Sequence, residues 1–227
     1  PPPLMPSICM KSEQLKDHYS GDVALLYANV RSQGDKWKNE QKALQKCLKT
    51  LPDSLNVLDV PVGTGRFFPF YKEHHHTVTG LDISPDMLAM ARRHDDFSEE
   101  HMSLAEANIT ALPYDNDFFD VAVCMRFFNL VSADVCSQSL RELSRVSKRY
   151  AIIGFRHINK PSHFGVQAIK QHILRFVKSL KGKIVLHDIE VLNQALANAH
   201  FKIVQEEFIE KRADDTTYCV YLLEKYD

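Results

Sequence analysis

From Asn56 onward, short apolar runs alternate with longer amphipathic stretches along the chain. Runs rich in β-branched and aromatic residues are typical of strands. We expect seven strands, at residues 56–60, 77–81, 102–107, 119–124, 150–155, 202–207 and 217–223. Because strands that alternate with helices are typical of βαβ units, the pattern predicts an α/β fold around a mostly parallel sheet.

Helical patterns fill the intervals between these runs. Ser84 and Pro85 have the chemistry of a helix start, an N-cap serine followed by proline at the first helical position. The leucines of Ala133–Val146 share one face of a predicted helix. A further amphipathic helix precedes the first strand and ends before Pro52, and residues 160–182 are predicted to be a helical insertion after the fifth strand.

Length and charge limit the class of protein. A chain of 227 residues that is 44% hydrophobic can bury one sizeable core. Its 28 basic and 29 acidic side chains give a net charge of -1, which creates no field that favours nucleic acid. We therefore expect one domain over residues 35–227, preceded by an N-terminal segment 1–34, and no nucleic-acid partner.

Cysteine usage and hydropathy bear on the compartment. The five cysteines are scattered and form no Cys-x-x-Cys pair, which favours reduced thiols. The first residues show no basic region followed by an apolar run, so we expect no signal peptide. No apolar stretch approaches the roughly 20 residues of a membrane-spanning helix. These features predict a cytoplasmic protein without a membrane span.

Three consecutive histidines, at positions 74–76, raise the possibility of a metal site because imidazole is a common ligand. Adjacent side chains on a loop before a strand cannot all face one ion in the geometry that zinc requires. We therefore predict an exposed turn and no metal.

The segment 58–66, Leu-Asp-Val-Pro-Val-Gly-Thr-Gly-Arg, carries the strongest chemical signal. A strand that ends in an acid, Asp59, and runs into Gly63 and Gly65 lets the main chain approach a ligand closely, because glycine has no Cβ. The second predicted strand ends at Asp82, 17 positions after Gly65, where a nucleotide-binding sheet offers a carboxylate to ribose hydroxyls. After the third strand, the Asn108 amide can bind an adenine edge.

These motifs resemble the class I S-adenosylmethionine-dependent methyltransferases. The matching pieces are Leu-Asp-Val-x-x-Gly-Thr-Gly, Gly-Leu-Asp-Ile-Ser-Pro-Asp-Met-Leu, Leu-Pro-x-x-Asp-x-x-Phe-Asp and Leu-Arg-Glu-Leu-Ser-Arg-Val, within residues 55–155. The resemblance implies a Rossmann-like, doubly wound seven-stranded sheet whose last strand is antiparallel. It also implies S-adenosylmethionine as the cofactor and a small molecule as the methyl acceptor.

The resemblance further implies roles by position. The methionine part of the cofactor would face Asp59, Gly63, Thr64 and Gly65; the ribose would face Asp82; the adenine would lie among Ile83, Met87, Asn108 and Ile109. The chain departs from the family at Pro61, where a glycine is usual, and at Asn108, where aspartate is frequent. Proline fixes φ and removes a donor, but we expect the turn to tolerate it because both later glycines remain.

Two other readings remain open. A nicotinamide dinucleotide fingerprint needs a third glycine three positions beyond the second, and this chain has Phe68 there. A methyltransferase-like domain that serves as an inactive interaction module is the other alternative. The intact Gly63, Gly65 and Asp82 favour the enzyme.

Residues at the ends of the fourth and fifth strands are candidates for acceptor binding, because ligands of open α/β sheets bind at the carboxyl ends of strands. Nitrogen-methylating relatives often carry Asn/Asp-Pro-Pro-aromatic after the fourth strand. Its absence disfavours an amide or nucleobase nitrogen and favours an oxygen acceptor, with a carbon or an amine as the alternatives. We expect Arg126 and Arg156 to bind a carboxylate. Asn129 would also contact the acceptor, and His157 or His163 would accept a proton. The alternative is that both arginines pair with surface acids such as Asp134 or Glu142.

Segment 1–34 contains Tyr27 and Arg31 on a mostly polar approach to the domain. By resemblance to relatives with an N-terminal cover, we expect this segment to form a lid that brings both residues to the cofactor. The alternative is a surface helix.

Overall fold

The computed structural model describes residue 16, residues 35–158, residue 185, residues 187–213 and residues 215–226. The predicted lid with Tyr27 and Arg31, the helical insertion at 160–182 and His163 lie outside the described residues.

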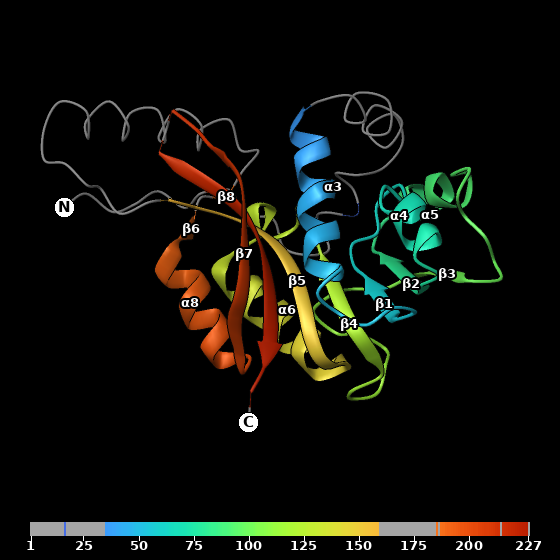
Figure 1. Ribbon diagram of the computed structural model, residues 1–227. Coiled ribbons are helices and arrows are strands. Elements are labelled where there is room, and N and C mark those ends of the chain that lie inside the picture. The colour runs from blue at the N-terminus through green and yellow to red at the C-terminus, as the bar shows by residue number, and fades with distance from the viewer. Residues whose placement is uncertain (1–15, 17–34, 159–184, 186, 214, 227) are drawn as a thin grey trace, which may run out of the picture.

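The described residues form one eight-stranded sheet (Figure 1). Its strands are β1 (Asn56–Asp59), β2 (Thr77–Asp82), β3 (Met102–Glu106), β4 (Phe119–Cys124), β5 (Ser147–Ile158), β6 (His187–Asp188), β7 (Phe201–Lys211) and β8 (Thr216–Lys225). The order is β3-β2-β1-β4-β5-β8-β7, with β6 paired to β5 beside this path. Strand β8 is antiparallel to β5 and β7, and the other pairs are parallel. The predicted sheet with an antiparallel last strand is confirmed, while the two-residue β6 was too short to be predicted.

Helices cover both faces of the sheet. They are α3 (Asp35–Leu48), α4 (Phe68–Glu73), α5 (Pro85–Arg92), the 3-10 helix η1 (Phe128–Leu130), α6 (Ala133–Val146) and α8 (Ile189–Asn198). Apolar residues of α3, α4 and α5 pack on one face, and those of α6 and α8 pack on the other. Among the described residues, no helix combines the length and the apolar character needed to cross a membrane.

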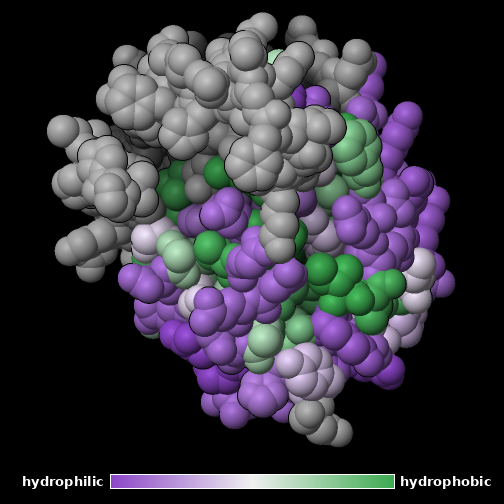
Figure 2. Space-filling model, turned by 90° about the vertical axis from the view of Figure 1, so that its left-hand side faces the viewer, coloured by the Kyte–Doolittle hydropathy of each residue, from purple (hydrophilic) through white to green (hydrophobic). Residues whose placement is uncertain are grey.

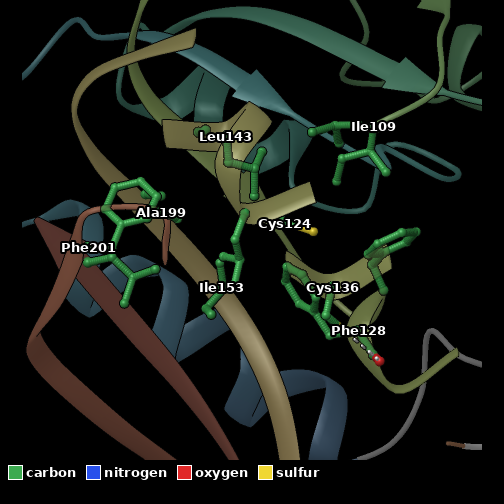
Figure 3. Packing of buried hydrophobic residues seen from close by; sticks show 14 of the residues in the cluster. Ile109, Cys124, Phe128, Cys136, Leu143, Ile153, Ala199 and Phe201 are labelled. Carbon is green, nitrogen blue, oxygen red and sulfur yellow. Dashed lines mark hydrogen bonds between the residues drawn. The ribbon is translucent and has the colours of Figure 1, made fainter. Parts of the chain in front are cut away.

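The central strands are buried on both sides, which explains their continuous apolar sequences. In β4, Val121 and Val123 belong to the core under α3, whereas Ala122 and Cys124 belong to the core under α6. Successive side chains of a strand point to opposite faces, so two cores share one strand. Figure 3 shows the α6 side of the sheet, where Cys124 and Ile153 of neighbouring strands lie near Leu143.

Local chemistry sets the ends of several elements. The Ser84 hydroxyl accepts a hydrogen bond from the Met87 main-chain nitrogen, which confirms the predicted cap of α5. Helix α6 has the predicted bounds. Strand β5 begins at Ser147, earlier than predicted. The prediction missed this start because the charges of Lys148 and Arg149 interrupt the apolar pattern. Their side chains form surface ion pairs with Asp120 and Glu224.

Strand β7 is the last strand in the sheet order and leaves several side chains exposed. Its pairing with β8 has two register shifts, between Ile203 and Gln205 and between Phe208 and Glu210. The Phe208 side chain is 63% exposed. Figure 2 shows the side of the molecule on which α8 lies, where hydrophilic side chains surround smaller hydrophobic areas.

Candidate functional site

A cleft opens where β1, β2 and β4 end, with about 840 Å³ of empty space including its open mouth. Parallel strands place their carboxyl ends at one edge of the sheet, which brings the separate sequence motifs together. The cleft is lined by the following residues of the predicted site: Gly63, Thr64, Asp82, Ile83, Met87, Asn108, Ile109 and Arg126. The remaining wall is mainly apolar and includes Met125 and Phe127, from the segment after the fourth strand where the acceptor was expected, and Leu130, which sequence reasoning did not assign.

The turn after β1 has the backbone conformation that glycine permits. Gly63 and Gly65 have φ values of +58° and +78°, in the left-handed region that other residues avoid. A Cβ on Gly65 would lie 2.3 Å from the ring of Phe68, whereas a Cβ on Gly63 would have no neighbour within 4 Å. Gly65 does not line the cleft and serves packing, while Gly63 lies at the cleft wall. Phe68 fills the place of the third glycine of a dinucleotide fingerprint.

Asp82 lies at the carboxyl end of β2 and is only 6% exposed. Its Oδ2 accepts a 2.9 Å hydrogen bond from the Gly63 nitrogen, and its Oδ1 accepts one of 2.9 Å from the Ser84 nitrogen. Burial raises the pKa of the Asp82 carboxyl to about 6, although these hydrogen bonds lower it. A carboxylate offers about four acceptor positions, and the main-chain nitrogens of Gly63, Ser84 and Ile83 use three of them, so capacity remains for a ribose hydroxyl.

Asp59 is fully buried behind the wall of the cleft. The Tyr71 hydroxyl donates a 3.2 Å hydrogen bond to Asp59 Oδ2. Burial raises the pKa of Asp59 to about 7. Asp59 does not line the cleft, and its contact with a methionine group stays a prediction.

The Asn108 side chain is held by its neighbour in sequence. Its Oδ1 accepts hydrogen bonds from the Thr110 nitrogen at 3.1 Å and the Thr110 hydroxyl at 2.9 Å. These bonds fix the amide at the end of β3, where it lines the cleft beside Ile109.

Arg126 follows β4, lines the cleft and pairs with Glu40 of α3. Arg126 Nε lies 2.7 Å from Glu40 Oε2, and Arg66 Nη2 lies 2.5 Å from the same oxygen. The partner is therefore neither Asp134 nor Glu142, the surface acids considered above. Sequence reasoning missed Glu40, although it lies on the same helical face as Leu44, which marks it as buried.

Three other residues predicted for the acceptor do not line the cleft. Arg156 is buried and pairs with Glu210, and its Nη1 donates to the Thr216 hydroxyl at 3.3 Å. Burial lowers the pKa of His157, whose Nδ1 has no hydrogen-bond partner within the described part of the chain. The main-chain oxygen of Asn129 accepts from the Val185 nitrogen at 2.7 Å.

Comparison with known proteins gives a family match over the central part of the chain. Residues 57–149 match the model of a methyltransferase domain. A malonyl-[acyl-carrier protein] O-methyltransferase of Salmonella typhimurium is 30% identical over 139 residues, which cover 59% of this chain and 52% of the relative. The chain thus spans about half the length of this curated relative.

Solved structures share the fold over nearly the whole chain. A magnesium protoporphyrin IX methyltransferase from Synechocystis with bound S-adenosylhomocysteine has a TM-score of 0.73 at 13% identity, over 95% of this chain and all of the other. The [4+2]-cyclase SpnF has a TM-score of 0.71 at 16% identity, over 96% of this chain and 97% of the other. At such identities the likeness establishes the fold.

Proposed function

We propose that the chain, whose residues 57–149 match a methyltransferase domain, is a class I S-adenosylmethionine-dependent methyltransferase that transfers a methyl group to an oxygen of a small anionic metabolite. The position of Asp82 supports cofactor binding most directly. Its buried carboxylate faces a cleft that also presents the Gly63 turn and the Asn108 amide. This combination suits ribose hydroxyls, an aliphatic chain and an adenine edge.

S-adenosylmethionine, when bound, would supply a methyl group attached to a positively charged sulfur. The bond between carbon and sulfur breaks as the acceptor atom, in line with it, bonds to the methyl carbon. The chain's contribution is to bind and align both reactants. Asp82 would accept hydrogen bonds from the ribose, and Ile83 and Met87 would contact the base. The apolar side chains of Phe127 and Leu130 exclude water from the cleft and so favour transfer to the acceptor over competing reactions.

An oxygen acceptor with an anionic group is supported by two observations. The matched Salmonella relative is an O-methyltransferase by name. Arg126 lines the cleft at the end of β4, where a guanidinium group suits a carboxylate.

The proton of a hydroxyl acceptor is proposed to pass to His157 or His163. The lowered pKa of His157 keeps its imidazole neutral and able to accept a proton at pH 7. Because His157 does not line the cleft, direct transfer requires the acceptor to reach the end of β5.

Calorimetric titration with S-adenosylmethionine, followed by a metabolite screen for S-adenosylhomocysteine release, tests the proposed function. We expect binding, and release only with certain hydroxy acids. Absence of cofactor binding would contradict the proposal. Binding without release from any acceptor would favour the interaction module, and conversion without release would favour a chemistry other than methyl transfer, as the likeness to a cyclase illustrates.

A further inference from the structure

Glu40, Arg66 and Arg126 form a charged cluster at the wall of the cleft, in which Glu40 is buried and both arginines are half-buried. They come from α3, from the turn after β1 and from the segment after β4. Strands β1 and β4 are parallel neighbours, so the segments that follow them meet at one edge of the sheet. A single oxygen, Glu40 Oε2, serves both guanidinium groups.

Arg66 is held more rigidly than a surface arginine. Its guanidinium carbon lies 4.4 Å from the centre of the Trp37 ring and 4.3 Å from that of Phe67. Aromatic contacts of this kind stabilise a guanidinium group. The Arg66 side chain is 9% exposed and still lines the cleft. Ordering before a ligand arrives lowers the entropy cost of binding.

Both guanidinium groups in this cluster pair with one carboxylate, that of Glu40. Arg66 pairs with no other acid within the described part of the chain. Asp59 also interacts with Arg66, but burial raises its pKa to about 7, so it is only partly ionised near neutral pH. Among the described residues, Arg66 Nε also has no hydrogen-bond partner, so Arg66 keeps donor capacity for a ligand at the cleft wall.

We propose that Arg66 and Arg126, held by the carboxylate of Glu40, bind a carboxylate group of a ligand in the cleft. The proposal rests on the proposed function and replaces Arg156 with Arg66 as the second guanidinium group. Arg156 faces Glu210 and Thr216 instead of the cleft. Two guanidinium groups from adjacent strand ends suit the planar, two-oxygen shape of a carboxylate.

Two ligands can supply this carboxylate. Arg66 directly follows the glycine turn, next to the place proposed for the methionine part of the cofactor. Arg126 follows β4, next to the place proposed for the acceptor. The cofactor and the acceptor would both offer a carboxylate to these arginines. Paired probes, with and without that group, distinguish the two ligands.

Glu40 acts in this arrangement as a positioning residue. Arg126 has a φ of +59°, an unusual conformation outside glycine that its surroundings must maintain. The 2.7 Å bond from its Nε to Glu40 fixes the side chain on this strained segment. Loss of the Glu40 side chain releases both guanidinium groups and leaves them free to turn from the cleft.

The test measures the preference for a carboxylate in parent protein and Arg66→Gln. The first pair of probes is S-adenosylhomocysteine and its analogue without the carboxylate. The second pair, added to protein saturated with S-adenosylhomocysteine, is 3-hydroxybenzoate and 3-hydroxybenzyl alcohol. In at least one pair, we expect the parent to bind the probe with the carboxylate more tightly than the probe without it. In Arg66→Gln this ratio of affinities should fall about tenfold, the effect of one charge-assisted hydrogen bond.

Loss in the first pair assigns the carboxylate to the cofactor, and loss in the second assigns it to the acceptor. Unchanged preference in both pairs overturns the proposal. If the parent fails to bind S-adenosylhomocysteine, the proposed function itself fails, which distinguishes the two failures.

Matched variants separate binding from folding. Arg149→Gln makes the same change in an exposed side chain that pairs with Glu224, and it should alter neither preference. Arg66→Lys retains the charge without the planar fork and should lie between parent and Arg66→Gln. For Glu40, the Gln variant keeps a shareable oxygen and should retain the preference, whereas Ala should lose it. Circular dichroism confirms that each variant is folded.

Discussion

The Asp82 carboxylate accepts a 2.9 Å hydrogen bond from the main-chain nitrogen of Gly63, and this bond ties the end of β2 to the turn after β1. Asp82→Ala therefore removes a ligand group and a support of the turn together. A charge-assisted hydrogen bond contributes about 1.5–3 kcal/mol, so we expect at least a tenfold loss of affinity for S-adenosylmethionine in calorimetry. Asp96→Ala, which removes an acid paired with Lys72, is the control. Equal affinity in Asp82→Ala would exclude Asp82 from the cofactor site.

The raised pKa of Asp82 predicts a pH-dependent affinity. Below its pKa of about 6 the carboxyl is protonated and has lost part of its capacity to accept hydrogen bonds. Affinity for S-adenosylhomocysteine should therefore rise as the pH increases through about 6. Asp82→Asn should bind more weakly and lose this step. Titrations between about pH 5 and pH 8 measure it, and an identical step in Asp82→Asn would assign the titration to another group.

The two glycines of the turn should differ in their tolerance of alanine. Gly65→Ala places a methyl group against the buried ring of Phe68 and also strains the backbone. Overpacking and a left-handed φ together cost about 2–5 kcal/mol. Gly63→Ala suffers only the backbone strain of about 1–2 kcal/mol, because nothing lies near its Cβ. Urea unfolding of both variants measures the difference, and equal stability losses would contradict the packing role of Gly65.

Asp59 should reduce stability as the pH rises. Its pKa is about 7 in the folded protein and near 3.8 when unfolded, so the folded state binds the extra proton between these values. Stability from this group is complete below about pH 4 and is lost as the pH rises through about 7. Asp59→Asn keeps an acceptor for Tyr71 and avoids the buried charge.

The free energy of unfolding of Asp59→Asn, relative to parent, should therefore increase from about pH 5 to pH 8. Three pKa units limit the gain to about 4 kcal/mol. Chemical denaturation at both pH values checks this prediction. A difference that does not change with pH would mean that Asp59 titrates at an ordinary pKa in the folded protein.

Sequence patterns predicted the cofactor half of the cleft because its residues follow strands at regular places. Gly63 and Asp82 each come at or after the end of a largely buried strand, Asn108 follows the third strand, and the parallel order of β1, β2 and β3 brings them together. The motif and the fold therefore specify the same positions. The cap at Ser84 was predicted for a similar reason, since its chemistry is local.

The acceptor half depended on side-chain direction, which strand position alone does not determine. Arg126 follows β4, whereas Arg156 lies inside β5, which extends to Ile158, and turns toward Glu210 on β7. That partner is 54 residues away in the sequence. Glu40 likewise meets Arg66 and Arg126 only after α3 packs on the sheet. The periodic apolar face of α3 marked Glu40 as buried, yet it did not identify its partners.

Strand β7 offers a poor template for a strand from another molecule. Its two register irregularities interrupt the straight row of main-chain groups that intermolecular pairing needs. Glu207 and Glu210, tied to Lys46 and Arg156, also keep charged side chains along this edge. During synthesis or refolding at high concentration, the sheet therefore resists growth from one copy into the next, although Phe208 exposes apolar surface there.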